Sequence, residues 1–176
     1  LELGLPVLQP VSVKEESFAL DLERYKADLF VVVAFSILPK RVLGCSKFGA
    51  VNVHGSLLPK YRGAAPVQWA IAKGDEKTGV SVFLKNKKMD HGPLLEQREF
   101  SIDLFDTSED VLNKMVEPGS EALDKALDRI AYGNIEELSP QEHEKASPAQ
   151  KLKKDDGKID FNMSALEIHN RIRAFY

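Results

Sequence analysis

The sequence predicts an α/β fold with a mostly parallel sheet and one antiparallel hairpin. Residues 29–34, LFVVVA, form a continuous apolar run rich in β-branched side chains, which is typical of a strand buried on both faces. Residues 79–84, GVSVFL, alternate as a strand, and residues 93–100 can pair with them across a polar loop of hairpin type. Segments with helical spacing separate the strands, and this alternation of strands with helices favours the α/β class.

Further elements follow from apolar spacing and from residues that begin or end helices. Pro39 suits the first turn of a helix, Thr107 can cap another, and Ser164 with Glu167 forms a capping box for the last one. Pro118-Gly119 is expected to interrupt a helical pattern. The predicted ranges are strands at 5–10 and 51–54, and helices at 13–25, 39–45, 67–73, 107–116, 123–130 and from 164 onward.

Composition and charge indicate an ordinary globular protein. The chain has 176 residues, 43% hydrophobic and 29% charged, which is enough for one core of ordinary size. The longest apolar run, residues 29–35, is far too short to span a bilayer. A net charge of −3 excludes an overall basic field, so any contact with nucleic acid must be local. Cys45 is the only cysteine, which excludes an internal disulfide, and we expect it to be a helix-packing residue rather than a nucleophile.

The stretch from residue 138 to 156 is predicted to be a solvated linker, because Pro, Gln, Glu and Lys dominate it. Within it, Lys151, Lys153 and Lys154 form a small basic cluster, for which a solvated face is favoured over a phosphate contact. The chain begins without an initiator Met or a targeting segment and ends at Tyr176, inside a predicted helix. We therefore expect both ends to be cut.

Residues 51–66, VNVHGSLLPKYRGAAP, give the strongest functional signal. The first four alternate with the period of a strand, which places Asn52 and His54 on the same side. An amide and an imidazole that converge at a strand end can both donate hydrogen bonds to one oxygen. The alternative is a strand edge with two polar side chains that neighbouring groups satisfy.

Asp90 lies in the hairpin loop MDHGP. A carboxylate on such a loop can orient an imidazole, keep it protonated, or relay a proton through water. Considered by itself, Asp90 is typical of an ordinary turn residue. If Asp90 meets His54, their ring and carboxylate atoms should lie within roughly 3–6 Å. His91 is expected to be a solvated loop histidine, with a second ring in the pocket as the alternative.

These residues resemble the formyl-tetrahydrofolate transferase and hydrolase superfamily, and longer strings resemble its methionyl-tRNA formyltransferase branch. Five separated motifs occur in the expected order, and together they cover nearly the whole chain. The motifs are GLPVLQPVS, Asn52 with His54 and the string SLLP, YRGAAPVQWAIAKGDEKTGVS, Asp90 followed by Gly92, and PAQKLKKDDGKIDFNMSALEIHNRIRAF. The resemblance implies a Rossmann-like formyltransferase fold.

The resemblance also implies roles for individual residues. Asn52, His54 and Asp90 match the catalytic trio, and Arg62 lies in the loop on the substrate side. The expected folate-binding residues are Ile37, Leu38 and Pro39, which match the loop around the pteridine ring, and Ser56, Leu57, Leu58 and Pro59, which match the active-site signature. The pteridine loop reads AFSILP, one residue shorter than the usual Ala-Tyr-Gly-x-Ile/Leu-Leu-Pro, so its shape is expected to differ.

Family members begin about sixty residues earlier and continue into a small β-barrel domain, so this chain resembles the middle of such an enzyme and is expected to lack the first strands. Residues 1–137 are then expected to form an N-terminally incomplete catalytic domain, and residues 138–163 the linker. Residues 164–176 would begin the helix of a truncated C-terminal domain.

The implied reaction is acyl transfer. The amino group of methionyl-initiator tRNA would attack the formyl carbon of 10-formyltetrahydrofolate. Asn52 and a protonated His54 would stabilise the charge on the formyl oxygen while Asp90 assists proton transfer. The implied reaction needs no metal and no nucleophilic serine, so Ser56 is expected to serve the turn. The alternatives are formyl transfer to a sugar-nucleotide amine and a non-catalytic fragment that binds folate or tRNA.

The expected partners are folate and initiator tRNA, with no membrane partner. We expect a monomer located in the bacterial cytoplasm or in an organelle.

Overall fold

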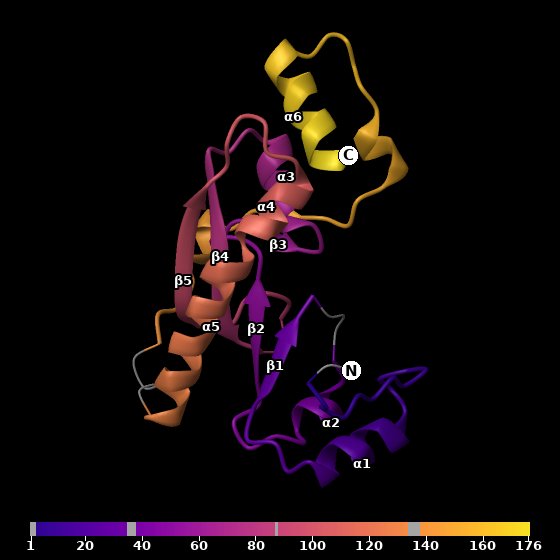
Figure 1. Cartoon of the computed structure of the whole chain (residues 1–176), viewed down its shortest axis with the longest axis vertical. Helices are drawn as coiled ribbons and strands as arrows, with labels where there is room; N and C mark the ends of the chain where they lie inside the picture. Colours follow the sequence, from indigo (N-terminus) through magenta and orange to yellow (C-terminus); the bar gives the residue numbers. More distant parts are fainter. Residues whose placement is uncertain (1–2, 35–37, 87, 134–137) are drawn as a thin grey trace. The chain divides into compact units, whose positions relative to one another are not determined.

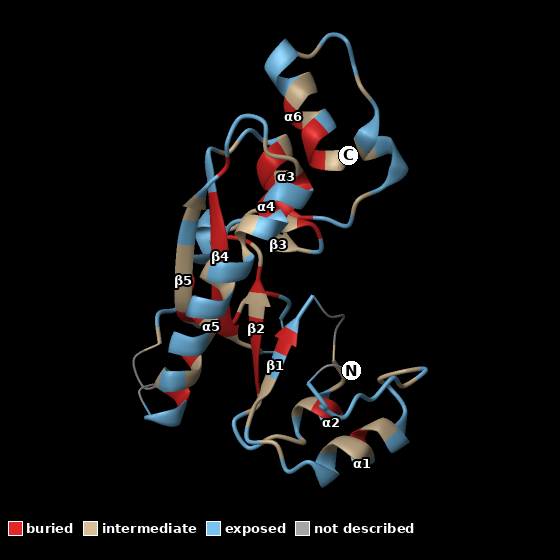
Figure 2. Ribbon diagram, viewed as in Figure 1, coloured by how far each residue is buried: buried red, intermediate tan, exposed pale blue. Residues whose placement is uncertain are grey.

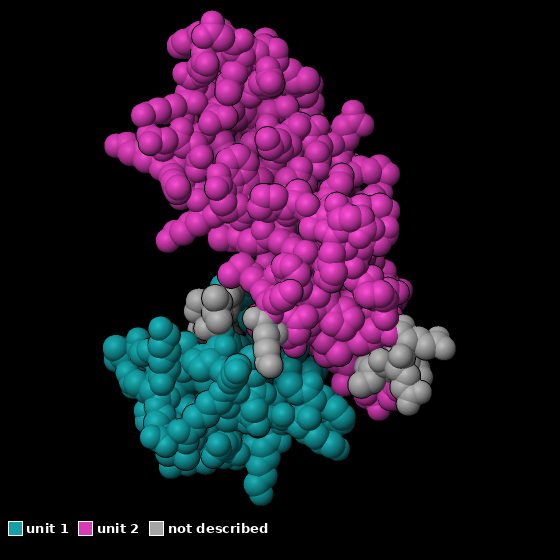
Figure 3. Space-filling model, turned by 180° about the vertical axis from the view of Figure 1, so that it is seen from behind, with its two compact units in different colours: residues 1–50 teal, residues 51–176 magenta. Residues whose placement is uncertain are grey.

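The structure is a computed structural model that describes residues 3–34, 38–86, 88–133 and 138–176. It contains two compact units, unit 1 with residues 1–50 and unit 2 with residues 51–176, which Figure 3 shows in different colours. This division falls inside the range that the sequence predicts as one catalytic domain. In the part of the chain that the structure describes, no helix is long and apolar enough to cross a membrane.

Unit 1 contains α1 (Glu16–Arg24), β1 (Phe30–Val33) and α2 (Lys40–Leu43). The two helices pack together, and their buried residues are Ala19 and Val42. Both helices occur in the expected order but are shorter than predicted, since each begins later and ends earlier along the chain.

Two details of unit 1 differ from the expectations. The range 5–10 forms no strand in the structure, and its apolar side chains are largely exposed, because an apolar run becomes a strand only with a hydrogen-bonded partner. In β1 only Val32 is buried, whereas Val31 is 43% exposed and Val33 58% exposed. The described residues leave that face of β1 open, so its apolar run is buried on one face and not on two.

In unit 2, β4 (Lys77–Leu84) lies between β2 (Ala50–His54) and β5 (Leu94–Ser101). The predicted hairpin is present, because β4 and β5 are antiparallel. β4 is also antiparallel to β2, which places His54 opposite Ser81. The antiparallel part of the sheet therefore extends one strand beyond the hairpin. Many buried residues of unit 2 lie in β2, β4 and α3 (Pro66–Ala72), as Figure 2 shows.

One long helix covers this sheet. α5 (Val116–Ala131) lies against β4 and β5, and its residues Ala122 and Ala126 are fully buried (Figure 1). The preceding helix, α4 (Ser108–Lys114), begins with the predicted capping interaction at Thr107. The predicted interruption at Pro118-Gly119 is wrong, because α5 continues through both residues. The break comes at Met115, and the proline falls in the first turn of α5, where a missing N–H leaves no helical hydrogen bond unmade.

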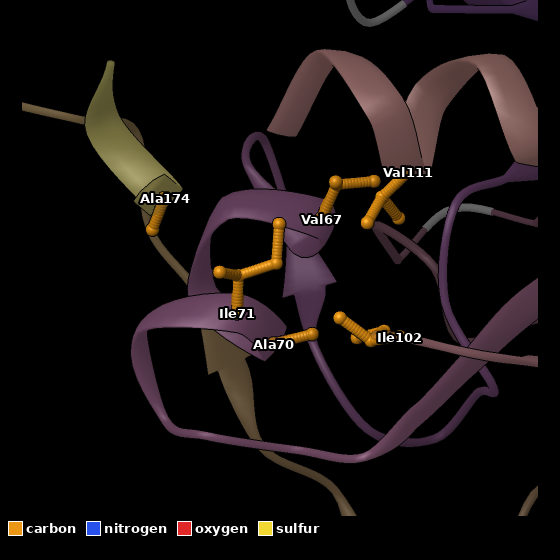
Figure 4. Packing of buried hydrophobic residues seen from close by; sticks show 6 residues of the cluster. All are labelled: Val67, Ala70, Ile71, Ile102, Val111 and Ala174. Atoms are coloured by element: carbon orange, nitrogen blue, oxygen red, sulfur yellow. The ribbon is translucent and has the colours of Figure 1, made fainter. Parts of the chain in front are cut away.

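A small hydrophobic core joins three helices (Figure 4). α6 (Ala165–Phe175) packs on α3 (Pro66–Ala72), and the rings of Trp69 and Phe175 meet edge to face with 5.7 Å between their centroids. α6 begins with the predicted capping box of Ser164. The buried members of the core are Val67, Ala70, Ile71, Ile102, Val111 and Ala174.

A second, two-stranded sheet joins distant parts of unit 2. β3 (Arg62–Gly63) pairs in parallel with β6 (Pro148–Ala149), so Arg62 lies opposite Pro148 and Gly63 opposite Ala149. We call residues 138–150, which include β6, the connecting segment. Ala149 is fully buried, so this segment packs on the protein, unlike the solvated connection that its composition indicates.

Candidate active site

Strand β2 presents two of the predicted catalytic side chains. Asn52 and His54 share one face of the strand, as the alternation predicts, and are only 8% and 6% exposed. The ladder with β4 fixes their backbone, with Asn52 opposite Phe83 and His54 opposite Ser81. Among the described residues, no group forms a hydrogen bond with the Asn52 amide. A buried amide without a protein partner is able to bind a ligand atom.

The His54 ring lies between a carbonyl and a carboxylate. Its Nε2 atom is 2.9 Å from the carbonyl oxygen of Tyr61, and since a carbonyl only accepts, Nε2 is the donor. Its Nδ1 atom is 4.0 Å from Oδ2 of Asp90, a distance inside the expected range. That separation is too long for a hydrogen bond. Nδ1 is therefore the ring atom that can exchange a hydrogen bond or a proton with a ligand.

Asp90 reaches the site from the turn between β4 and β5. It has a φ angle of +54°, a left-handed conformation that Asp tolerates better than most residues. Its Oδ2 atom accepts a 2.9 Å hydrogen bond from the backbone N–H of Gly63. The same turn needs glycine at position 92, because a Cβ there would overlap the carbonyl of Leu84. The carboxylate is thus fixed by a hydrogen bond from β3 and by a tight turn.

The signature residues Ser56 to Pro59 are held by a buried polar network. Ser81 of β4 donates to the carbonyl of Ser56 at 2.6 Å and accepts from the N–H of Leu58 at 3.0 Å. Gln97 of β5 donates to the carbonyl of Leu58 at 3.0 Å. The Ser56 hydroxyl donates to the carbonyl of Lys60 at 2.7 Å, so it serves the turn, as expected.

The side chains of the signature divide between two environments. Ser56 and Leu58 are buried, whereas Leu57 and Pro59 are half-buried. A folate ligand could contact the half-buried pair, and the buried pair would shape the loop. Their part in folate binding stays a prediction.

Arg62 belongs to β3, and its side chain contacts the connecting segment. Its Nε atom donates to Oε1 of Gln141 at 3.1 Å, and Nη2 donates to the same oxygen and to Nδ1 of His143. Burial lowers the pKa of Arg62, and the charge of Asp90 opposes that effect. Sequence reasoning missed Gln141, because nothing in its polar surroundings distinguishes it from a linker residue.

Tyr61 positions His54 through its backbone. It has a φ angle of +59°, and its hydroxyl donates to Oδ2 of Asp75 at 2.9 Å. Burial is the main cause that raises the pKa of the Tyr61 phenol, and the Asp75 carboxylate raises it further. The phenol therefore stays neutral and anchored while the carbonyl oxygen holds Nε2 of His54.

The predicted pteridine loop is only partly described. Ile37 lies outside the described residues. Leu38 and Pro39 belong to unit 1, where both are half-buried, and Pro39 directly precedes the first turn of α2. The described ranges contain no group of three His, Cys, Asp or Glu residues placed to hold a metal ion.

Replacing Gly63 with alanine should destabilise this arrangement. Gly63 has a φ angle of +131°, and a Cβ there would overlap the carbonyl of Ala149 in β6. Gly133 has a φ angle of +75°, and no described neighbour lies within 4 Å of a Cβ placed there, so Gly133→Ala is the control for a positive φ angle without a close contact. In chemical denaturation, Gly63→Ala should lower the free energy of unfolding by about 1–3 kcal/mol more than Gly133→Ala does. Equal losses would mean that β6 does not constrain residue 63.

Comparison with known proteins gives related sequences over the whole chain. A family model described as formyl transferase matches residues 4–127, and one described as formyl transferase, C-terminal domain, matches residues 151–176. The methionyl-tRNA formyltransferase of Thermodesulfovibrio yellowstonii is 42% identical over 177 residues, which cover 100% of this chain and 57% of that protein. The chain thus spans about half the length of such relatives.

Solved structures are similar as well. An N-formyltransferase from Helicobacter canadensis, in complex with folinic acid and dTDP-3-aminofucose, is 28% identical with a TM-score of 0.67, over 80% of this chain and 54% of that chain. HypX from Aquifex aeolicus, in complex with tetrahydrofolic acid, has a TM-score of 0.75 at 20% identity, over 89% of this chain and 27% of that chain, and this shows the fold alone. The predicted fold class is confirmed, and the chain belongs to the formyl transferase family.

Proposed function

We propose that the protein transfers the formyl group of 10-formyltetrahydrofolate to the amino group of methionyl-initiator tRNA. The observation that supports this most strongly is the buried His54 ring, held by the Tyr61 carbonyl on one side with Asp90 on the other. Relatives named methionyl-tRNA formyltransferase, 42% identical along the whole chain, favour this acceptor. A cytoplasmic location and a monomeric state stay predictions.

The first step forms a bond between the amine nitrogen and the formyl carbon. As the carbonyl π bond opens, negative charge develops on the formyl oxygen, and the Asn52 amide donates a hydrogen bond to it. A protonated His54 donates from Nδ1, because Nε2 is already engaged with Tyr61. Both donors are almost fully buried, where such hydrogen bonds stabilise charge more effectively than in water.

The second step breaks the bond between the formyl carbon and N10 of the folate. The amine loses one proton as the amide forms, and N10 gains one as it leaves. Asp90 accepts the proton from the amine and passes it to N10 as the bond to the formyl carbon breaks, so the carboxylate is regenerated, and its Oδ2 stays oriented by the Gly63 N–H. The carboxylate also stabilises the positive charge on His54 during both steps.

A second acceptor is the amine of a nucleotide-linked sugar. The Helicobacter canadensis N-formyltransferase, whose structure contains dTDP-3-aminofucose, resembles this chain at 28% identity. In both reactions the formyl group would pass to an amine, so the same chemistry would serve either acceptor. The difference lies in the groups that surround the acceptor, beyond the trio itself.

A direct comparison of acceptors tests the proposal. The full natural chain is incubated with 10-formyltetrahydrofolate and either charged initiator tRNA or a dTDP-amino sugar, and formylated product is measured in each case. We expect turnover with the tRNA and at most trace product with the sugar. Product only with the sugar would replace the proposed acceptor, and folate binding without product from either would indicate a binding protein.

A further inference from the structure

One buried glutamine of the connecting segment joins Arg62 to the Asp90 turn. The side chain of Gln141 is almost completely buried. Its Nε2 atom donates to the carbonyl of Asp90 at 3.0 Å and to the carbonyl of Gly92 at 2.7 Å. Its Oε1 atom accepts two hydrogen bonds from the Arg62 guanidinium. Neither family match, over residues 4–127 or 151–176, includes this position.

The chemistry of its partners fixes the orientation of the Gln141 amide. A guanidinium only donates hydrogen bonds, and backbone carbonyls only accept them. The oxygen of the amide must therefore face Arg62, and its nitrogen must face the turn. All four of these hydrogen bonds would be lost if the amide rotated by half a turn.

The two carbonyls that Gln141 binds belong to Asp90, whose backbone is left-handed, and to Gly92, two residues further along the turn. A left-handed conformation at a residue other than glycine persists only when its surroundings hold it. The side chain of Asp90 is held by the Gly63 N–H, and its backbone is held by Gln141. Gly63 lies next to Arg62 in β3, so both supports come from one short strand and its partner segment.

We propose that Gln141 is a positioning residue that keeps the Asp90 carboxylate beside Nδ1 of His54. This role rests on the proposed function of Asp90 in proton transfer. Gln141 touches neither reacting group and acts only through the backbone of the turn. Arg62 contributes by holding the glutamine amide in the orientation that donates to the turn.

Two substitutions separate this role from general packing. Gln141→Glu keeps the size of the side chain and the acceptor for Arg62 but removes both donors to the turn. Gln141→Leu removes donors and acceptor together. Gln150→Leu is the matched control, because Gln150 lies in the same connecting segment with an exposed side chain.

In the full natural chain, Gln141→Glu should lower kcat about 10–100-fold, within the range that a displaced acid–base group costs. The KM for 10-formyltetrahydrofolate should change less than about twofold, since the effect lies in the chemical step. Gln150→Leu should behave as the wild type. In an Asp90→Asn background, Gln141→Glu should cost little more, because the two residues act as one unit.

Hydrogen exchange provides a test that needs no activity. The Gly63 amide donates to Asp90, so it should exchange at least about tenfold faster in Gln141→Glu than in Gln150→Leu when the turn moves. Unchanged exchange together with an unchanged kcat would overturn the positioning role. The positioning role would also be overturned if Gln141→Glu lowered kcat by the same factor in the Asp90→Asn background as in the wild type. If the wild type formylates neither acceptor, the proposed function fails, and the exchange of Gly63 still decides whether Gln141 holds the turn.

Discussion

Asp90→Asn should lower the rate of formyl transfer by about 10²–10⁴-fold, the range for loss of a general acid or base. Asparagine has nearly the same shape, tolerates the left-handed backbone of this turn, and still accepts the Gly63 N–H through its amide oxygen. It cannot take a proton from the amine, and it adds no negative charge beside His54. Steady-state kinetics with charged initiator tRNA measure the effect.

The binding of the formyl donor separates chemistry from damage to the site. Affinity for a 10-formyltetrahydrofolate analogue should change little in Asp90→Asn, because the substitution leaves the signature loop in place. Asp124→Asn, on the exposed side of α5, is the control and should leave the rate unchanged. A rate near that of the wild type in Asp90→Asn would remove Asp90 from proton transfer.

Asn52→Ala should lower turnover about 10²–10³-fold, the usual cost of one lost oxyanion donor. The fold should tolerate the change, since Asn52 makes no hydrogen bond with its side chain among the described residues and its backbone stays in the ladder with β4. Asn52→Asp tests whether residue 52 faces negative charge in the transition state. A carboxylate of the same size would repel the developing oxyanion, so its turnover should fall at least as far as that of the alanine variant.

The measurement is again the rate of formyl transfer, together with thermal unfolding of each variant. Exposed Asn162→Ala serves as the control for an asparagine outside the site. If Asn52→Asp is more active than Asn52→Ala, the residue does not face negative charge in the transition state. Stabilisation of the formyl oxygen would then have to come from His54 alone.

Local patterns in the sequence predict most elements because the information lies within a few residues. The alternation around His54 is confirmed as β2, and the capping residues Thr107 and Ser164 are found where they were expected. The pairing of Asn52 with His54 on one face follows from the same alternation. That Asp90 lies beside His54 could be proposed only through the family resemblance, since no local pattern places a hairpin turn next to a strand.

The differences arise where tertiary context decides. Pro118 reads as a helix breaker, yet the first turn of α5 accepts it because no hydrogen bond is lost there. The run at β1 reads as buried on both faces, but burial depends on which elements cover it. Gln141 and β6 act through backbone groups of distant residues, such as the Asp90 carbonyl bonded to the Gln141 amide. Such contacts require no apolar pattern, so composition alone suggested a linker.

The parallel pairing of β3 with β6 limits how this protein can change length during evolution. Any insertion or deletion between Gln141 and Ala149 would shift β6 against Arg62 or pull the glutamine from the turn. Polar connecting segments usually tolerate such changes well. We therefore expect homologous chains to vary in length at exposed positions after residue 150 and to keep a constant spacing before it. A chain that stopped before β6 would retain all three proposed catalytic residues but lack the strand that anchors their loops.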